Sequence, residues 1–579
     1  MWESLRTVGV HLWRYRMGLG LGLGALVLKD VAGAVQPLVI RSAIDTLSHA
    51  YGLARLLRFA AYLVGLAAVK GLFQYWMRVI IIGISRDIEY DLRNDLFRHL
   101  VELSPDYYGH MRTGDIMARA TNDLNAVRMM LGPGIMYWTE TSLTFVLAIV
   151  IMVTVDWRLA LLALVPAPLV SLAVIFFGRA IHARFERIQA MFSDISSRVQ
   201  ESLAGVRMVR AFVQEDAELR HFEKLNRAYI AENIRLVRIS GVFQPLLEAL
   251  IGLTFLAVLW YGGGQVLNGR ISLGSFVMFN TYMGILVWPM IALGWVVNLM
   301  QRGGASLARI NQIFAEKPTI AAPALPVPMA GVRGEIEFRN VSVAYPSGRA
   351  LENASLTIAA GATVAVVGHT GAGKSTLASL VPRLMDPTGG RVLLDGTDLR
   401  DLSPAELRRH IGFVPQETFL FSATIAGNIA FGVESATEEE IRRAAELAGL
   451  AGDIESFPMG YETVVGERGI TLSGGQKQRT AIARAILRNP RILILDDALS
   501  SVDTLTEERI LEGLTAAMHG RTVILISHRV STVRQADRIV VLEHGRIVEQ
   551  GTHAELVAAG GYYADLSQKQ MLEEELEAI

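Results

Sequence analysis

The residues with the clearest chemistry lie between 368 and 376, where the run GHTGAGKST follows the apolar segment TVAVV. Gly371 and Gly373 carry no Cβ, so the backbone N–H groups beside them can turn toward phosphate oxygens at a helix start. Lys374 offers a point charge for the β- and γ-phosphates, and Ser375 offers a hydroxyl to Mg²⁺. The flanking strand disfavours a chance glycine turn. We expect the phosphate contacts to come from Gly368, Thr370, Gly371, Gly373, Lys374, Ser375 and Thr376.

Two acids follow a second apolar run, ILIL at 492 to 495. A buried parallel strand presents such acids at the carboxyl edge of its sheet, where α/β proteins place their chemistry. We expect Asp496 to face Mg²⁺ and Asp497 to face the attacking water. Upstream, LSGGQ at 472 to 476 precedes a helix and forms a second anion cradle. Its members are Ser473, Gly474, Gly475 and Gln476.

Tyr345 ends the strand-like run VSVAY, immediately before Pro346. An exposed ring at this place, upstream of the phosphate loop, could stack on adenine. The alternative is an ordinary buried strand tyrosine. Its position relative to the phosphate loop favours the adenine contact.

The elements that must position these residues begin near Gly334. From there short β-rich runs alternate with amphipathic helices, which predicts an α/β nucleotide-binding domain over 334–579. Residues 316–333 interrupt the preceding helical pattern with Pro318, Pro323, Pro326 and Pro328, and are typical of a linker.

The first 315 residues have a different character. Of the 579 residues, 51% are hydrophobic and 19% charged, with a mean hydropathy of +0.35, so a membrane part plus a soluble part is expected. Each of six apolar segments is near or above the ~20 residues that a bilayer requires. They cover roughly 17–46, 55–84, 132–155, 159–180, 241–267 and 274–300.

Charge fixes the expected orientation of these helices. Arg6, Arg14 and Arg16 precede the first segment, which favours a cytoplasmic N-terminus by the positive-inside rule. Six spans then return the chain to the cytoplasm, so we expect a multi-pass protein of the cell (inner) membrane. The net charge of −1 does not suggest nucleic acid as a partner. The absence of cysteine excludes disulfides and Cys-ligated zinc.

Together these motifs resemble the ATP-binding cassette (ABC) family, and the match covers nearly the whole chain. Further matching segments are a Q-loop ending in Gln416, the loop Thr463 to Gly469, a D-loop from Ser500 to Asp503 and a switch histidine, His528. The resemblance is to a half-size exporter of the multidrug type. It implies an all-α six-helix transmembrane domain followed by an α/β P-loop domain with a helical subdomain.

The resemblance also implies shared ATP sites. In a head-to-tail dimer each ATP lies between the P-loop of one chain and the signature of the other. Gln416 would sense Mg²⁺ and the γ-phosphate, and His528 would contact the γ-phosphate. The loop that contains Glu467 would touch the coupling turns.

One residue departs from the family pattern: Asp497 stands where such proteins usually have glutamate. A carboxylate one methylene shorter falls short of the attacking water in a preorganised site. The loss is about two to three powers of ten in rate, or ~3 to 4 kcal/mol in barrier. The intact signature favours a heterodimer whose other subunit carries glutamate. A homodimer with a weak aspartate base, an ATP-gated channel or regulator, and a fused importer are the alternatives.

Four charged residues fall inside the predicted spans, namely Lys29, Asp30, Glu140 and Glu248. Unpaired charge is costly in a membrane, but pairing across a dimer, a water-filled vestibule and cargo contact all remain open. Lys29 and Asp30 point in different directions on a helix and need not pair with each other. Aromatic and methionine residues near Pro289 could line a permissive cavity for drugs, lipids or peptides, or could face lipid.

Overall fold

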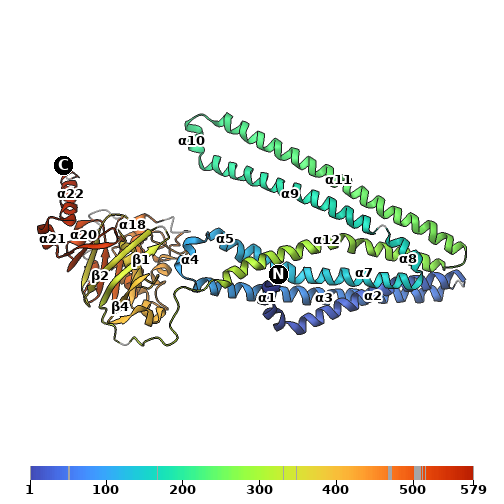
Figure 1. Cartoon of the computed structure of the whole chain (residues 1–579), viewed down its shortest axis with the longest axis horizontal. Helices are drawn as coiled ribbons and strands as arrows, with labels where there is room; N and C mark the ends of the chain where they lie inside the picture. Colours follow the sequence, from blue (N-terminus) through green and yellow to red (C-terminus); the bar gives the residue numbers. More distant parts are fainter. Residues whose placement is uncertain are drawn as a thin grey trace. The chain divides into compact units, whose positions relative to one another are not determined.

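The computed structural model describes residues 2–49, 52–165, 167–329, 331–346, 348–466, 472–500, 510, 513–515 and 517–577. The chain forms two compact units (Figure 1). The first unit contains Met1–Val101 and Arg112–Glu316, and the second contains Glu102–Met111 and Lys317–Ile579. A short segment from the first part of the chain therefore belongs to the second unit.

The described part of the first unit is entirely helical, which agrees with the predicted fold class. Six stretches are long and apolar enough to cross a membrane, at Arg16–Ser48, Leu53–Glu102, Thr113–Val155, Trp157–Ala204, Glu215–Leu267 and Leu273–Ala315. They are longer than the ~20 residues that a bilayer needs because several helices continue into polar surroundings. The principal helices are α1 (Trp2–Arg14), α2 (Arg16–His49), α3 (Leu53–Glu102), α7 (Ile135–Val155), α8 (Trp157–Leu164), α9 (Ala167–Ala204), α10 (Val206–Ala211), α11 (Glu215–Leu267) and α12 (Leu273–Ala315).

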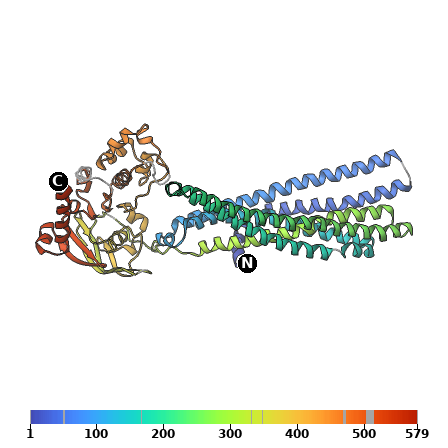
Figure 2. The ribbon, with the colours of Figure 1, turned by 90° about the horizontal axis from the view of Figure 1, so that it is seen from above.

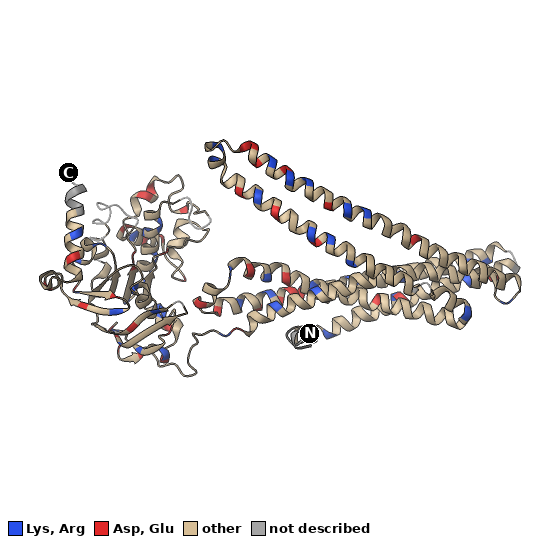
Figure 3. Ribbon diagram, turned by 45° about the horizontal axis from the view of Figure 1, so that its top comes forward, with Lys and Arg blue, Asp and Glu red and all other residues tan. Residues whose placement is uncertain are grey.

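Helices α9 and α11 run side by side and are joined by the short α10 (Figures 1 and 2). Their charged residues gather in the halves nearest α10, whereas the halves nearest α8 are largely uncharged (Figure 3). This division is what a helix pair requires when one half lies in lipid and the other in water.

Tight turns join some of the spans, and polar side chains cap them. Asp156 begins α8 by accepting hydrogen bonds from the N–H groups of Arg158 and Leu159, at 2.9 and 3.0 Å. Ser272 caps α12 and donates to Asp45 at the end of α2, at 2.7 Å. Such caps satisfy the N–H groups that a helix start leaves without partners.

The second unit contains two sheets. The first has the order β2-β1-β4-β5 and is antiparallel, and the second has the order β10-β9-β3-β8-β7-β6. Strands β9, β3, β8, β7 and β6 are parallel neighbours. The strands are β1 (Ile336–Tyr345), β2 (Gly348–Ile358), β3 (Thr363–Val367), β4 (Gly389–Leu394), β5 (Thr397–Asp398), β6 (Ile411–Val414), β7 (Ile492–Asp496), β8 (Thr522–Ile526), β9 (Arg538–Glu543) and β10 (Arg546–Gly551).

Strands β7 and β8 are buried along their whole length, as expected of parallel strands covered on both faces. One apolar core lies between the two sheets and α13 (Lys374–Leu380). A second core joins β6, β7 and β8 to a helical subdomain. That subdomain contains α15 (Ile425–Ala430), α16 (Glu438–Leu447), α17 (Ala451–Ser456) and α18 (Gly474–Leu487).

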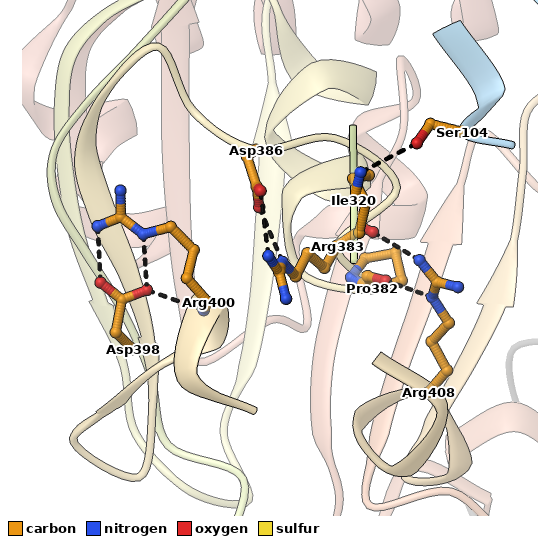
Figure 4. Close-up of polar contacts among 8 residues, drawn as sticks. All are labelled: Ser104, Ile320, Pro382, Arg383, Asp386, Asp398, Arg400 and Arg408. Atoms are coloured by element: carbon orange, nitrogen blue, oxygen red, sulfur yellow. Dashed lines mark hydrogen bonds and ion pairs between the residues drawn. The ribbon is translucent and has the colours of Figure 1, made fainter. Parts of the chain in front are cut away.

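The segment before β1 has neither helix nor strand over its described residues from Lys317 to Gly334. Its Ile320 N–H donates to Ser104 Oγ at 3.1 Å, next to α4 (Pro105–His110), in the same unit (Figure 4). This contact lies within the second unit, to which residues 102–111 belong.

The end of α13 is held by arginine side chains (Figure 4). Arg408, on α14 (Pro404–Arg409), donates to the carbonyls of Pro382 and Arg383 at 2.9 and 2.7 Å. Arg383 has a left-handed backbone, with φ of 49°, and pairs with Asp386 at 2.9 Å. These bonds fix the far end of the helix that begins at the phosphate loop.

Candidate active site

The phosphate loop connects β3 to α13 and depends on glycine at two packed positions. A Cβ built on Gly368, where φ is 150°, would lie 2.1 Å from the carbonyl oxygen of Leu542. A Cβ on Gly373, where φ is 101°, would lie 2.3 Å from the carbonyl oxygen of Ala350. Gly371 is different, because its φ of 83° is left-handed but open space surrounds it. Only glycine therefore fits the two ends of the loop.

Lys374, the first residue of α13, is buried and donates to the loop carbonyls of Gly368 and His369, at 2.8 and 3.0 Å. Burial lowers the pKa of Lys374, while the nearby carboxylates of Asp497 and Asp496 raise it. The ammonium thus lies inside the loop, close to where phosphate oxygens would enter.

Asp496 ends the buried strand β7 and is itself only 3% exposed. Burial raises the pKa of Asp496, and a hydrogen bond from Ser375 lowers it. Asp496 Oδ1 has no hydrogen-bond partner among the described residues. A buried carboxylate oxygen without a partner, beside a serine hydroxyl, is the kind of oxygen ligand set that Mg²⁺ prefers. These residues therefore fit the ion.

Asp497 follows with a left-handed backbone, φ 50°. Its N–H donates to the Ile526 carbonyl at 2.9 Å, and its own carbonyl accepts from Gln478 Nε2 at 3.4 Å and from Ser500 Oγ at 3.0 Å. The backbone of residue 497 is thus tied to β8 on one side and to α18 on the other. Its carboxylate can approach a substrate only as far as its own length allows.

His528 lies just after β8. Burial and the charge of Lys374 lower the pKa of His528, whereas Asp497 and Asp496 raise it. A net lowering keeps the imidazole neutral near pH 7, so one ring nitrogen can donate and the other accept.

A cavity of about 280 Å³ brings most of the predicted residues together. Its lining residues are Tyr345, Ala350, Thr370, Gly371, Gly373, Lys374, Ser375, Thr376, Gln416, Asp496, Asp497, Ile526 and His528. Gly368 is not among them, since it packs against Leu542 and holds Lys374. Tyr345 is 37% exposed, so it is a rim residue and not the buried strand tyrosine of the alternative.

The signature residues lie elsewhere. Ser473 caps α18 with a reciprocal pair of hydrogen bonds to Gln476, at 3.2 and 3.0 Å. Gln476 also donates to Asp453 at 2.9 Å. None of Ser473, Gly474, Gly475 and Gln476 lines the cavity of the same chain. That the signature serves another chain's nucleotide stays a prediction of the resemblance.

Several contacts around the site had no clear signal in the sequence. Ala350 and Ile526 line the cavity, although the run TVILI leading to His528 could have pointed to Ile526. Gln478 reaches the Asp497 carbonyl from the signature helix. Gln570 donates to the His528 carbonyl at 2.6 Å and accepts from the Val530 N–H at 2.7 Å.

Gln570 belongs to α22 (Tyr562–Glu577), near the C-terminus. The first residue of that helix, Tyr562, packs its ring against His369 of the phosphate loop, with centroids 4.8 Å apart. One helix therefore contacts both the phosphate loop and the backbone around the switch histidine. Residues 467 to 469 of the predicted loop, which include Glu467, and the D-loop residues 501 to 503 lie outside the described residues.

Comparison with known proteins gives the family. The ABC transporter transmembrane region matches residues 19–290, and the ABC transporter domain matches residues 351–500. The probable multidrug resistance ABC transporter ATP-binding/permease protein YheI of Bacillus subtilis (strain 168) is 36% identical over 99% of this chain and 98% of its own length. The chain belongs to the ABC transporter family. This ABC transporter is therefore a multi-pass membrane protein with an ATPase domain coupled to transport.

Other relatives of this ABC transporter are similar along most of their length. The ATP-dependent lipid A-core flippase of Syntrophus aciditrophicus (strain SB) is 39% identical, over 88% of this chain and 84% of its own. A solved structure of a bacterial Atm1-family ABC exporter with ATP bound matches with a TM-score of 0.77 and 29% identity, covering 96% of this chain and 99% of that chain. The predicted fold class is confirmed, with six helical spans followed by a nucleotide-binding domain.

Proposed function

We propose that the protein is one subunit of an ATP-driven exporter that moves amphipathic or hydrophobic substrates, such as drugs, lipids or peptides, out of the cytoplasm. Relatives named as a multidrug resistance transporter and a lipid A-core flippase support the drug and lipid part of this cargo range. We place the membrane domain at 1–315, the linker at 316–333 and the nucleotide-binding domain at 334–579. The nucleotide-binding domain and N-terminus would face the cytoplasm across the cell (inner) membrane.

In the proposed cycle, two ATP molecules bind between the domains of two subunits and stabilise their closed state. Because ATP must bind the closed state better than the open one, it shifts the population from inward-facing to outward-facing. Lys374 and the loop N–H groups hold the phosphates, and neutral His528 donates a hydrogen bond to the γ-phosphate. Mg²⁺, held by Ser375, Asp496 and Gln416, would neutralise phosphate charge.

The observation that carries the finer proposal is the fixed backbone of Asp497. Because hydrogen bonds tie this residue to β8 and α18, the backbone cannot easily move to compensate for the missing methylene. A base that falls short of the attacking water loses most of its contribution to the rate. We infer that this chain's own P-loop site hydrolyses ATP slowly.

In this proposal, the LSGGQ signature of this chain completes the ATP site on the other subunit. Ser473 caps α18 and its hydroxyl accepts from the Gln476 N–H, whereas the N–H groups of Gly474 and Gly475 lie in the first turn, where a helix supplies no backbone partner, so they can serve a phosphate bound by another chain. A homologous half-transporter with a glutamate base would then supply turnover. We therefore favour a heterodimer with one slow and one working site.

The test is ATP-driven uptake of a labelled amphipathic substrate into inverted membrane vesicles. The vesicles contain the full-length chain and the half-transporter that co-purifies with it. Concentrative uptake that disappears when the companion's catalytic glutamate is changed to glutamine supports the proposal. Dissipation of a gradient without accumulation would indicate an ATP-gated channel. A stable homodimer with substrate-stimulated ATPase activity would favour the aspartate-base alternative.

A further inference from the structure

A second cavity, of about 170 Å³, lies inside the first unit among α2, α3, α7 and α12. Its polar lining residues include Lys29, Asp30, Lys70 and Glu140, and its less polar wall includes Tyr282, Ile285 and Trp288. These helices contain candidate membrane spans. Four ionisable groups around one membrane cavity are uncommon, because charge in a bilayer is costly and tends to mark a functional pathway.

Three of the four groups form an ion-pair centre around Lys29. The Lys29 ammonium lies 2.9 Å from Asp30 Oδ1 and 2.5 Å from Glu140 Oε1. The sequence left the pairing of Lys29 and Asp30 open, and the structure shows that they do pair, because the long lysine stem lets its ammonium turn back to the neighbouring carboxylate. The side chains of Lys29 and Asp30 are 4% exposed, whereas that of Glu140 is 28% exposed. The Lys29–Glu140 pair links α2 to α7 within a single chain.

Three polar groups at the cavity are left without full partners among the described residues. Asp30 Oδ2 is buried without a hydrogen bond. The Lys29 bond uses Oε1 of Glu140, and no bond uses its Oε2. Lys70, on α3, makes no ion pair among the described residues. Its Nζ lies near Gly33 of α2, at 3.7 Å from the place that a Cβ on this glycine would occupy. The cavity therefore has acceptor oxygens from α2 and α7, and a cation from α3 that has no ion pair among the described residues.

Most of the remaining wall is apolar. Tyr282 is 1% exposed and donates its hydroxyl to the Ala34 carbonyl, so its polar tip is satisfied and its ring forms wall. Trp288 is 59% exposed and lies beside Pro289 at the lining. At ~30 Å³ for each water molecule, the cavity has room for about five to six waters, which is comparable to a small charged head group.

We propose that this cavity binds the zwitterionic head of an amphipathic cargo. The ammonium of the head lies against the carboxylates of Asp30 and Glu140, and its anionic group lies against Lys70. The four protein charges sum to zero, so a neutral zwitterion adds no net charge to the membrane interior, whereas a simple anion or cation would. The apolar part of the cargo extends over Trp288. This inference rests on the proposed export function and assigns its cargo class.

Two sources could supply this chemistry, a zwitterionic phospholipid and an amphipathic peptide with free termini. The experiment measures nucleotide-free binding to the full-length transporter, with its companion subunit if one co-purifies, by ligand-induced thermal stabilisation. The probes are dioctanoyl phosphatidylethanolamine, dioctanoyl phosphatidylglycerol, and a short apolar peptide with free or blocked termini. Phosphatidylglycerol and the blocked peptide lack the ammonium. Binding of phosphatidylethanolamine would indicate a phospholipid cargo, and binding of the peptide with free termini would indicate a peptide cargo.

Lys70→Met is the primary variant, because Lys70 has no described ion pair that its loss would break. Glu140→Gln is the second variant. Lys224→Met and Glu248→Gln are matched controls, because both residues are exposed, lie on α11, and do not line the cavity. We expect each cavity variant to weaken binding of the zwitterion about tenfold or more, and each control to leave it unchanged. Glu140→Gln should also remove the preference for phosphatidylethanolamine over phosphatidylglycerol.

Equal binding of zwitterions and anions by the unmodified protein would overturn the inference, as would unchanged zwitterion binding in Lys70→Met. Either result leaves the proposed export function standing, because that function is tested separately by ATP-driven uptake. Conversely, failure of uptake with retained zwitterion binding would refute the export proposal and not the site.

Discussion

Replacing Asp497 by glutamate lengthens the side chain by one methylene, about 1.5 Å, on a backbone that hydrogen bonds to Ile526, Gln478 and Ser500 hold in place. If the aspartate falls short of the attacking water, the added length restores a general base. We expect ATP hydrolysis at this chain's P-loop site to rise about 10²- to 10³-fold, equivalent to ~3 to 4 kcal/mol.

The same backbone predicts a cost in stability. Residue 497 has a φ of 50°, a left-handed conformation that aspartate tolerates better than glutamate because its short side chain bonds locally. We expect Asp497→Glu to lower the free energy of unfolding by about 1 kcal/mol. We therefore expect Asp497→Glu to hydrolyse ATP faster and to be slightly less stable than the unmodified protein.

The assay is steady-state ATP hydrolysis in a complex whose companion subunit carries its catalytic glutamate as glutamine, so that only this chain's P-loop site can turn over. Asp497→Gln is the matched control, since it has the length of glutamate without its basicity. If Asp497→Glu is no faster than Asp497→Gln, length is not what limits the site. If Asp497→Asn hydrolyses ATP a hundredfold more slowly than the unmodified chain, the aspartate already acts as an effective base, and the proposed length limit is wrong.

Three further predictions concern the same site. Gln570→Leu removes two hydrogen bonds, worth about 1 kcal/mol each, from the backbone around His528. We expect the kcat for ATP hydrolysis to fall about tenfold with little change in KM, whereas Gln568→Leu on the same helix should have no effect. An equal change in both variants would contradict the positioning role of Gln570. Burial raises the pKa of Asp496, so the contribution of this group to folding stability is complete only below its unfolded pKa and is lost as pH rises. Asp496→Asn should therefore raise the thermal stability of the nucleotide-free protein at about pH 7, while removing the further stabilisation by ATP with Mg²⁺. A less stable nucleotide-free variant would contradict this. Burial lowers the pKa of His528, so the contribution of this group to folding stability is complete above about pH 6.5 and is lost as pH falls toward the pKa of the folded state. Denaturant unfolding should therefore show a smaller loss of stability on acidification for His528→Gln than for the unmodified protein. Parallel stability curves for the two proteins would contradict this.

Local sequence patterns predicted the residues of the candidate site better than their surroundings. Lys374 and Asp496 each follow a short apolar strand, and such strands are readable because parallel strands in a covered sheet form continuous apolar runs. The same reasoning correctly predicted the six spans, since a bilayer imposes a minimum apolar length. Where chemistry and a local backbone pattern coincide, the sequence alone indicates which residues lie together.

Contacts between distant segments could not be predicted in this way. Gln570 bonds the backbone of His528 from 42 residues away, and Lys29 meets Glu140 across 111 residues. Nothing in the local pattern around Gln570 distinguishes it from a solvated glutamine on a polar helix. The left-handed backbone of Asp497 was equally hidden, because it follows from bonds to β8 and α18. Such features arise from tertiary packing and require the three-dimensional structure.

The position of Lys374 has a consequence for how nucleotide is recognised. Its ammonium already lies away from bulk water, held by the peptide oxygens of Gly368 and His369. Most of the dehydration of this cation was therefore incurred when the chain folded, and an arriving triphosphate need not strip it again. Recognition at this point is an exchange of oxygen partners around a prepared cation, and its speed depends on how readily two main-chain carbonyls release their hold.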